Sequence, residues 1–211
     1  MDFTPKSLLR YSRKLLKYLD QDNKVLSAKA VRKIVDGDIE AATGRFYSLL
    51  QDFQYGQLSE EQFRKDFKKA VSNLHLAHVA AAQGGFRNMT QAAWGFAGQR
   101  IRQQYGYVDG LVNDIQQGLL SGPKGLLRMK QWAASAMDSY EAMLQKVHSP
   151  EEFPFAENLL NQQNVSEKNC PICTGLTALG IVERNQIPLP EDRHFGCNCG
   201  IAYYRSDTEG E

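Results

Sequence analysis

Between residues 94 and 119, apolar side chains recur every three or four positions, which is the spacing of one face of an α-helix. A stripe of this length strongly constrains the fold, because it needs a partner surface of similar length to cover it. Five glycines lie within the stripe, and each costs about 1 kcal/mol relative to alanine in a helix. We therefore expect a helix that is weak or bent and that packing holds together. The stripe consists of Trp94, Ala97, Ile101, Tyr105, Val108, Val112, Ile115 and Leu119.

Similar stripes precede and follow this one. Ser27 is a typical N-cap for a long helix, and Ser59 with Gln62 forms a capping-box pattern before the next. After a turn at residues 121–123, helical spacing resumes, and two long helices joined by so short a turn should pack antiparallel. The sequence therefore predicts a mainly α fold, an elongated helical bundle with a long antiparallel helical hairpin over residues 94–147, followed by a small α+β module.

Polar and aromatic residues on these stripes are interpreted as core. His75 and His78 are three residues apart and could face one metal ion, but His78 lies on the apolar stripe and no carboxylate motif accompanies the pair. We predict that both serve packing. Trp94, Trp132 and the tyrosines lie at or near stripe positions, and we expect them in the core as well.

The N-terminus predicts a short basic amphipathic helix within residues 1–23, begun by Thr4-Pro5. Its basic face has two interpretations. It is either a solvated surface or a docking surface for an acidic partner, such as DNA phosphates or a negatively charged protein ring. The candidate partner-binding residues are Lys6, Arg10, Arg13, Lys14 and Lys17.

All four cysteines of the chain lie near its C-terminal end, as Cys170-x-x-Cys173 and Cys197-x-Cys199. Two thiolates separated by two residues can bind one metal ion from a tight knuckle, and a second pair on a returning segment completes the tetrahedron that Zn²⁺ prefers. We predict a zinc-knuckle-like module in which these four cysteines bind one Zn²⁺, with His194 as a substitute ligand. Because so small a module has little core, a metal would explain its stability.

Two alternatives to zinc stay open, namely disulfide bonds and unligated thiols in a small core. A thioredoxin-like redox role is disfavoured, because no β-α-β pattern surrounds the first cysteine pair. The expected organisation is a basic helix over 1–23, a helical body over 24–164, a cysteine-rich module over 165–205 and an acidic tail over 206–211.

Composition narrows the classes of function. With 42% hydrophobic and 23% charged residues the chain is neither disordered throughout nor a membrane bundle, and we expect neither a membrane span nor a secretory signal. A net charge of +1 is too balanced for a protein whose whole surface binds nucleic acid. Because the sequence has no phosphate-binding loop, Ser-His-Asp order or H-E-x-x-H pattern, we do not expect an enzyme.

The C-terminal residues resemble the signature of tailed-bacteriophage minor head proteins, also called head morphogenesis proteins. That signature has a C-P-x-C knuckle, a short helix ending in glycine, a leucine-proline segment and a closing C-x-C before an aromatic residue. Residues 170–180, 187–190 and 197–204 match these parts in order. Residues 84–121 resemble the helical region that precedes the signature, so the resemblance covers 84–205 and not the first 83 residues.

The resemblance implies a structural virion component near the portal vertex of the phage head, made in the cytoplasm of a bacterial host. The implied partners are the portal or connector, the major capsid protein and packaged DNA, with several copies in a symmetric assembly. No effector domain follows the signature, so we expect no attached toxin or enzyme. The alternative is a zinc-containing nucleic-acid-binding adaptor, but only Arg184 and Arg193 are basic between Cys170 and Cys199, which counts against the module as a DNA reader.

Overall fold

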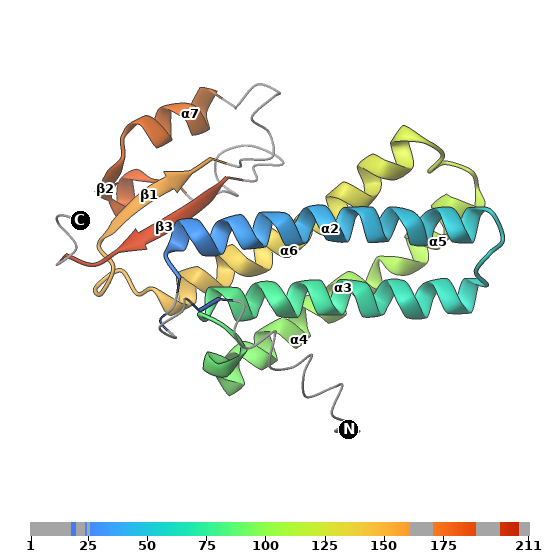
Figure 1. Ribbon diagram of the computed structural model, residues 1–211, viewed down its shortest axis with the longest axis horizontal. Coiled ribbons are helices and arrows are strands. Elements are labelled where there is room, and N and C mark those ends of the chain that lie inside the picture. Colours follow the sequence, from blue (N-terminus) through green and yellow to red (C-terminus); the bar gives the residue numbers. More distant parts are fainter. Residues whose placement is uncertain (1–17, 20–23, 25, 161–170, 189–198, 207–211) are drawn as a thin grey trace.

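The computed structural model describes residues 18–19, 24, 26–160, 171–188 and 199–206. It is mainly helical, with one small antiparallel sheet, and so confirms the predicted mainly α class. Figure 1 shows the long helices α2 and α3 side by side, with the sheet and the short helix α7 at the end of the bundle where α2 begins.

The helices α2 (Ala28–Gln54) and α3 (Glu60–Ala82) begin where the capping residues predict. The Ser27 hydroxyl accepts a hydrogen bond from the Ala30 amide at 3.3 Å, and the Ser59 hydroxyl accepts one from the Gln62 amide at 3.2 Å. The Gln62 side chain donates to Asp66 instead. The structure therefore gives Ser59 its N-cap bond, while the Gln62 side chain is engaged one turn further along α3.

The helix α6 (Pro123–Val147) is the centre of the bundle, because it packs on both α2 and α3. Phe67 lies between Phe46 and Trp132, with ring centroids 4.9 and 5.1 Å apart. Trp132 is buried, as expected. Gly125 allows α6 to begin close to the preceding turn, since a Cβ atom there would overlap the Leu120 carbonyl oxygen.

The stripe over residues 94–119 forms two helices rather than one, α4 (Gln91–Gly106) and α5 (Val108–Gln116), which meet at Tyr107. The break shifts the buried face, so that α4 buries only Ala93 and Ala97. The prediction of a core position is wrong for Trp94, which is 43% exposed, and for Tyr55 and Tyr107, which are 75% and 55% exposed. The glycines of the stripe explain the break, since propensity does not hold a single helix together across them.

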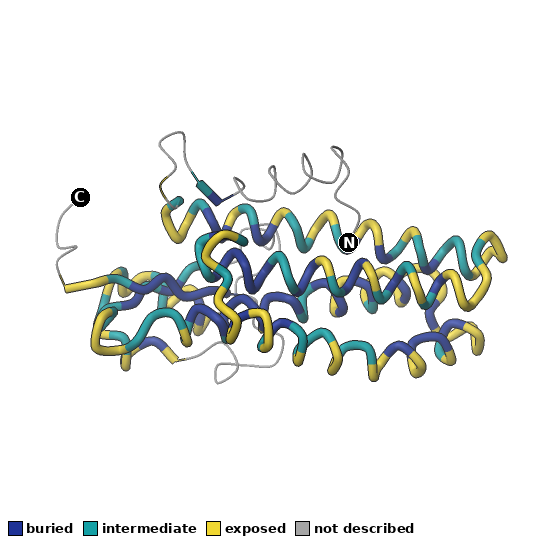
Figure 2. The backbone as a smooth tube through the Cα atoms, turned by 90° about the horizontal axis from the view of Figure 1, so that it is seen from below, coloured by how far each residue is buried: buried dark blue, intermediate teal, exposed yellow. Residues whose placement is uncertain are grey.

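The long hairpin expected over residues 94–147 is not the main packing unit. The helix α4 packs mostly on α3, and α6 makes its most extensive contacts with α2 and α3. Figure 2 shows the consequence, with buried residues lining the facing sides of the long helices. The bundle is thus organised by helices that are distant in sequence as well as by neighbours.

The sheet consists of β1 (Phe155–Leu159), β2 (Ile181–Glu183) and β3 (Gly200–Tyr204), in the order β2-β1-β3 with both pairings antiparallel. The helix α7 (Pro171–Ala178) packs on β1. Short 3-10 turns lie at Phe86–Asn88 and Arg184–Gln186. Because β1 lies before residue 165, the strands begin earlier in the chain than the sequence predicts.

Among the helices that the structure describes, none is both long enough and apolar enough to cross a membrane.

Candidate metal centre

The structure places two of the four predicted zinc ligands. Cys173 lies in the first turn of α7, Cys199 directly precedes β3, and both are buried. Cys170, Cys197 and His194 lie outside the described residues. The structure therefore locates two of the candidate ligands, and the metal site itself stays a prediction from the sequence.

A buried asparagine on the central strand holds the start of α7. The Asn158 side-chain amide donates to the Cys173 carbonyl oxygen at 2.9 Å and to the Thr177 hydroxyl at 2.6 Å. The Thr177 hydroxyl in turn donates to the Cys173 carbonyl, at 3.0 Å. Because a buried amide is costly unless it is hydrogen-bonded, these contacts fix the backbone of Cys173 on β1.

The register of the sheet brings Cys199 to the same end of β1. Asn158 lies opposite Ile201 and Leu159 lies opposite Gly200, so Cys199 immediately precedes the first paired position of β3, at the end of β1. The Cys173 carbonyl, held by Asn158, and Cys199, which precedes the partner of Leu159, thus both lie toward the carboxyl end of β1. One of these cysteines comes from α7 and the other from a returning segment, and a zinc site built from two cysteine pairs would take its ligands from two such segments.

Within the ranges that the structure describes, no group of three or more His, Cys, Asp or Glu side chains could hold a metal ion. Cys173 and Cys199 provide two ligands, and a four-coordinate zinc ion needs two more. The sequence offers Cys170 and Cys197 for these positions. The metal thus stays a prediction.

A buried ionic cluster lies beneath this end of the sheet. Arg32 of α2 donates through Nη1 to Oε1 of Glu141 on α6 at 2.8 Å, and through Nε to Oδ1 of Asp36 at 3.0 Å. All three residues are buried, with 6% or less of their surface exposed. Burial raises the pKa of the Asp36 carboxyl group, although Arg32 acts in the opposite direction. Removing charge from water is costly, so such a cluster persists only when its members satisfy one another.

The first residue of β3 completes this cluster. A Cβ atom on Gly200 would overlap Nη1 of Arg32 and would lie 2.8 Å from Oε1 of Glu141. Only glycine leaves room for the guanidinium group at this position. Since Gly200 follows Cys199, the candidate ligand is one residue from the contact that joins the sheet to the helical bundle.

Sequence reasoning missed this cluster. A signal was present for one pair, because Arg32 and Asp36 are four residues apart and each follows a stripe residue, Val31 and Val35. Nothing in the sequence marks Glu141 as their partner, since it lies more than a hundred residues later. The role of Gly200 depends on that tertiary contact.

The prediction that His75 and His78 serve packing is confirmed, because both are buried between α3 and its neighbours. Nδ1 of His75 lies 2.8 Å from the Ser139 hydroxyl, and Nδ1 of His78 donates to the Leu74 carbonyl at 2.9 Å. Burial, helped by the charges of His78 and Arg100, lowers the pKa of His75 to about 3. His75 is therefore neutral at physiological pH.

The proposed N-terminal docking face lies outside the described residues, so Lys6, Arg10, Arg13, Lys14 and Lys17 stay a prediction. A cavity of about 700 Å³ opens beside the sheet, between the end of α6 and residues 183–188. Arg184 lies at its wall, where it donates to the His148 carbonyl at 2.6 Å and covers the Tyr203 ring at 4.4 Å. These contacts join the sheet to the segment that follows α6.

Comparison with known proteins found no matching family model, no matching curated protein and no matching solved structure.

Proposed function

We propose that this chain is a structural minor head protein of a tailed phage, bound at or near the portal or connector vertex, where it supports head assembly or the retention and ejection of DNA. The resemblance over residues 84–205 gives the proposal its specific content. The structural observation that supports it is the close packing of Gly200 against Arg32 and Glu141, because it joins the last strand of the sheet to the helical bundle. A mainly helical body with a small sheet packed on its end suits an assembly part.

In this proposal Cys170, Cys173, Cys197 and Cys199 bind one Zn²⁺, with His194 as the substitute ligand. The site is supported by the placement of both Cys173 and Cys199 toward the carboxyl end of β1. The test is elemental analysis of protein purified under reducing conditions, which should find about one zinc ion per chain, lost in Cys170→Ser. Metal-free protein with two intact disulfides would contradict the zinc site.

The basic face of the N-terminal helix is the proposed attachment surface for an acidic patch on the portal, connector or major capsid protein. Replacing Arg10, Arg13 and Lys14 together by glutamate should leave the chain folded but absent from assembled heads.

The matched control replaces Arg45, Lys124 and Lys130 by glutamate. These are three exposed cations on α2 and α6, and heads should incorporate this variant normally. If heads incorporate the variant with glutamate at positions 10, 13 and 14, the N-terminal helix is not the attachment surface. If purified heads lack even the unmodified chain, the proposed structural function is wrong.

The adaptor alternative makes a different prediction. If the zinc module and the N-terminal helix were the nucleic-acid-binding parts, affinity should fall steeply with salt and Cys170→Ser should abolish binding. The structural proposal predicts that Cys170→Ser affects incorporation into heads instead.

A further inference from the structure

A polar cavity of about 290 Å³ opens between α4 and α6, beside the break at Tyr107. Because α4 packs mostly on α3, the facing part of α6 is left partly uncovered there. Trp132 is buried, whereas Tyr107 and Gln131 are exposed, so the cavity reaches from the surface into the bundle. The lining residues are Gln104, Tyr107, Arg128, Gln131, Trp132 and Ser135.

The lining is polar, although facing helices normally pack through apolar side chains. Arg128, Gln131 and Ser135 are three and four residues apart, so they lie on one face of α6. Gln104 and Tyr107 are three residues apart where α4 ends. Each of these side chains can form hydrogen bonds, and none is a carboxylate. Such a cavity holds water or a polar ligand rather than apolar side chains.

The guanidinium group of Arg128 has no counter-charge in the part of the chain that the structure describes. Arg128 is partly buried, and it takes part in none of the ion pairs found there. Its Nη1 donates to Oε1 of Gln131 at 3.5 Å, which is too long to contribute much, and its Nε is buried without a hydrogen-bond partner. Water can hydrogen-bond to this cation but cannot neutralise it, so the cavity favours an anion.

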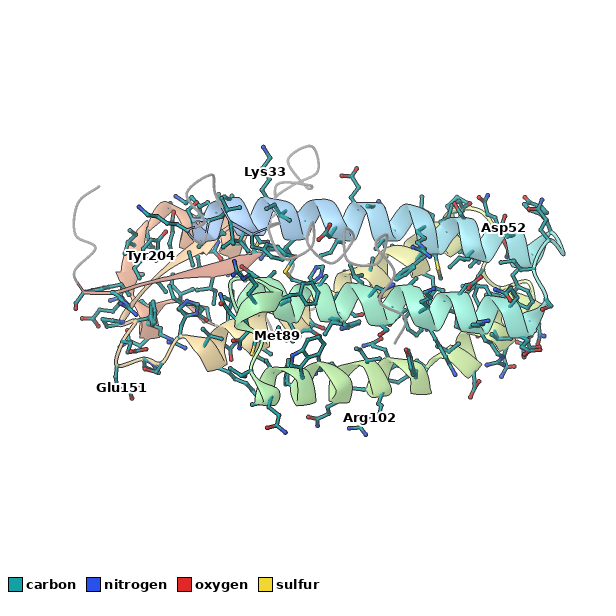
Figure 3. All side chains as sticks on the ribbon, turned by 60° about the horizontal axis from the view of Figure 1, so that its bottom comes forward. Lys33, Asp52, Met89, Arg102, Glu151 and Tyr204 are labelled. Atoms are coloured by element: carbon teal, nitrogen blue, oxygen red, sulfur yellow. The ribbon has the colours of Figure 1, made fainter. Side chains whose placement is uncertain are left out.

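The charge of the lining sets the charge of that anion. The helix α4 contributes no cation, because the Arg100 guanidinium lies 5.4 Å from the Phe96 ring centroid and Figure 3 shows Arg102 pointing away from the bundle. Arg128 is therefore the one cation among the described residues that line the cavity. A guanidinium group binds a planar carboxylate through two parallel N–H bonds, whereas a doubly charged phosphate would keep one charge uncompensated.

We propose that this cavity binds a small polar monocarboxylic acid, with its carboxylate on Arg128 and its other polar groups on the glutamine amides and the Ser135 hydroxyl. The Ser135 hydroxyl donates to the Trp132 carbonyl at 2.7 Å, so its oxygen stays available as an acceptor. The volume of about 290 Å³ is at the lower end of the range for ligand pockets, which suits a metabolite rather than a polymer. The inference depends on neither the zinc site nor attachment to a phage head.

The test uses Trp132 as its reporter. The chain contains two tryptophans, and Trp94 does not line the cavity, so the full chain with Trp94→Phe has its only tryptophan in the site. The emission of this protein is titrated with lactate, pyroglutamate and 4-hydroxyphenylacetate, each beside its neutral amide. At least one acid should change the emission saturably, and its amide should bind about tenfold or more weakly, because it lacks the charge.

Two charge variants, made in the same Trp94→Phe protein, test the assignment to Arg128. Arg128→Gln should weaken binding of the acid about tenfold or more. It should not lower the thermal midpoint, because it removes a partly buried charge that lacks a partner. Lys130→Gln is the matched control, since it removes the same charge from an exposed position on the same helix, and it should change affinity less than about twofold.

Gln131→Glu supplies the missing counter-charge from within the protein. The new carboxylate would replace an amide whose oxygen already lies 3.5 Å from Nη1 of Arg128. It should therefore compete with the ligand, so that binding of the acid is lost while the thermal midpoint is kept or raised.

Four outcomes would overturn the proposal. If no acid changes the emission saturably up to about 10 mM, the cavity holds only water. If the amides bind as tightly as the acids, the site does not select a carboxylate. If inorganic phosphate displaces the acid at the same concentration, the site is a general anion site. Equal weakening by Arg128→Gln and Lys130→Gln would show an effect of overall charge.

Discussion

Gly200 lies directly against the guanidinium group of Arg32, so closely that no larger residue fits while Arg32 keeps its place. Arg32 belongs to the first turns of α2, and Gly200 begins the last strand of the sheet. Their contact is therefore one of the points at which the last strand of the sheet packs on the first long helix, beside the ion pair of Lys29 with Glu157. Substitution of either residue should therefore lower the stability of the fold.

Gly200→Ala should destabilise the protein by about 2 kcal/mol or more, because the added methyl group must displace a buried ion pair. Gly175→Ala is the matched control, since Gly175 lies in α7 with no atom near its Cβ position. It should be neutral or stabilise by up to about 1 kcal/mol. Urea unfolding of both variants measures the difference, and equal stabilities would contradict the tight contact.

Arg32→Met should cost about 3 kcal/mol or more, because it removes the guanidinium group that bridges the buried carboxylates of Asp36 and Glu141. Arg64→Met makes a useful comparison, since Arg64 also bridges two carboxylates, those of Glu60 and Asp109, but at the surface. That variant should cost less than about 1 kcal/mol. Similar losses of unfolding free energy in the two variants would show that burial does not distinguish the clusters.

Acid should destabilise the fold through His75. Its pKa is about 3 in the folded chain against 6.5 for the unperturbed group, so the unfolded state alone takes up this proton between those values. The contribution of His75 is fully present above pH 6.5. It is lost as the pH falls, by about 3 kcal/mol at about pH 4.

Unfolding free energies at about pH 7 and about pH 4 should therefore differ less in His75→Gln than in the unmodified chain. His148→Gln serves as a second variant, because burial also lowers the pKa of His148. The carboxyl group of Asp36 has a raised pKa and acts with the opposite sign, since its stabilising effect declines as the pH rises. An unchanged pH dependence in His75→Gln would contradict the neutral, buried state of this ring.

Metal removal should loosen the sheet before the bundle. In protein that contains zinc, a chelator should speed amide hydrogen exchange in β3 and at the start of α7, because Cys199 and Cys173 lie there. Exchange in α3 should change little, since its contacts are with α2, α4 and α6. Exchange that is equally fast in all elements would mean that the metal holds the whole fold rather than the module.

The helices were predictable because their signals are local. The caps at Ser27 and Ser59, the turn before Pro123 and the apolar spacing of α2, α3 and α6 are all read within a few residues. The position of Trp94 was not predictable, because it depends on the break at Tyr107 and on which face α4 turns to α3. Periodicity predicts an apolar stripe, but where a helix is interrupted it does not predict which face each of the two resulting helices buries.

The candidate metal centre likewise has a part that a local sequence pattern predicts and a part that depends on tertiary contacts. The cysteine spacing is a local pattern that points to the segment containing Cys173 and Cys199, and the metal inferred from it stays a prediction. The cluster of Arg32, Glu141 and Gly200 depends on residues from three distant parts of the chain, which spacing cannot relate. The pairing of β1 with β3 was missed for the same reason.

That pairing has a consequence for the order of folding. The helices α2, α3 and α6 pack on one another, and the last of them ends at residue 147. One edge of β1, in contrast, pairs with residues 200–204, which are synthesised much later. During synthesis the bundle therefore has time to form while one edge of β1 is still open. Closure of the sheet, and with it the seating of Gly200 on Arg32, is then the last step. A chain interrupted shortly before that strand would present a formed bundle with an unpaired strand edge, a species prone to aggregate.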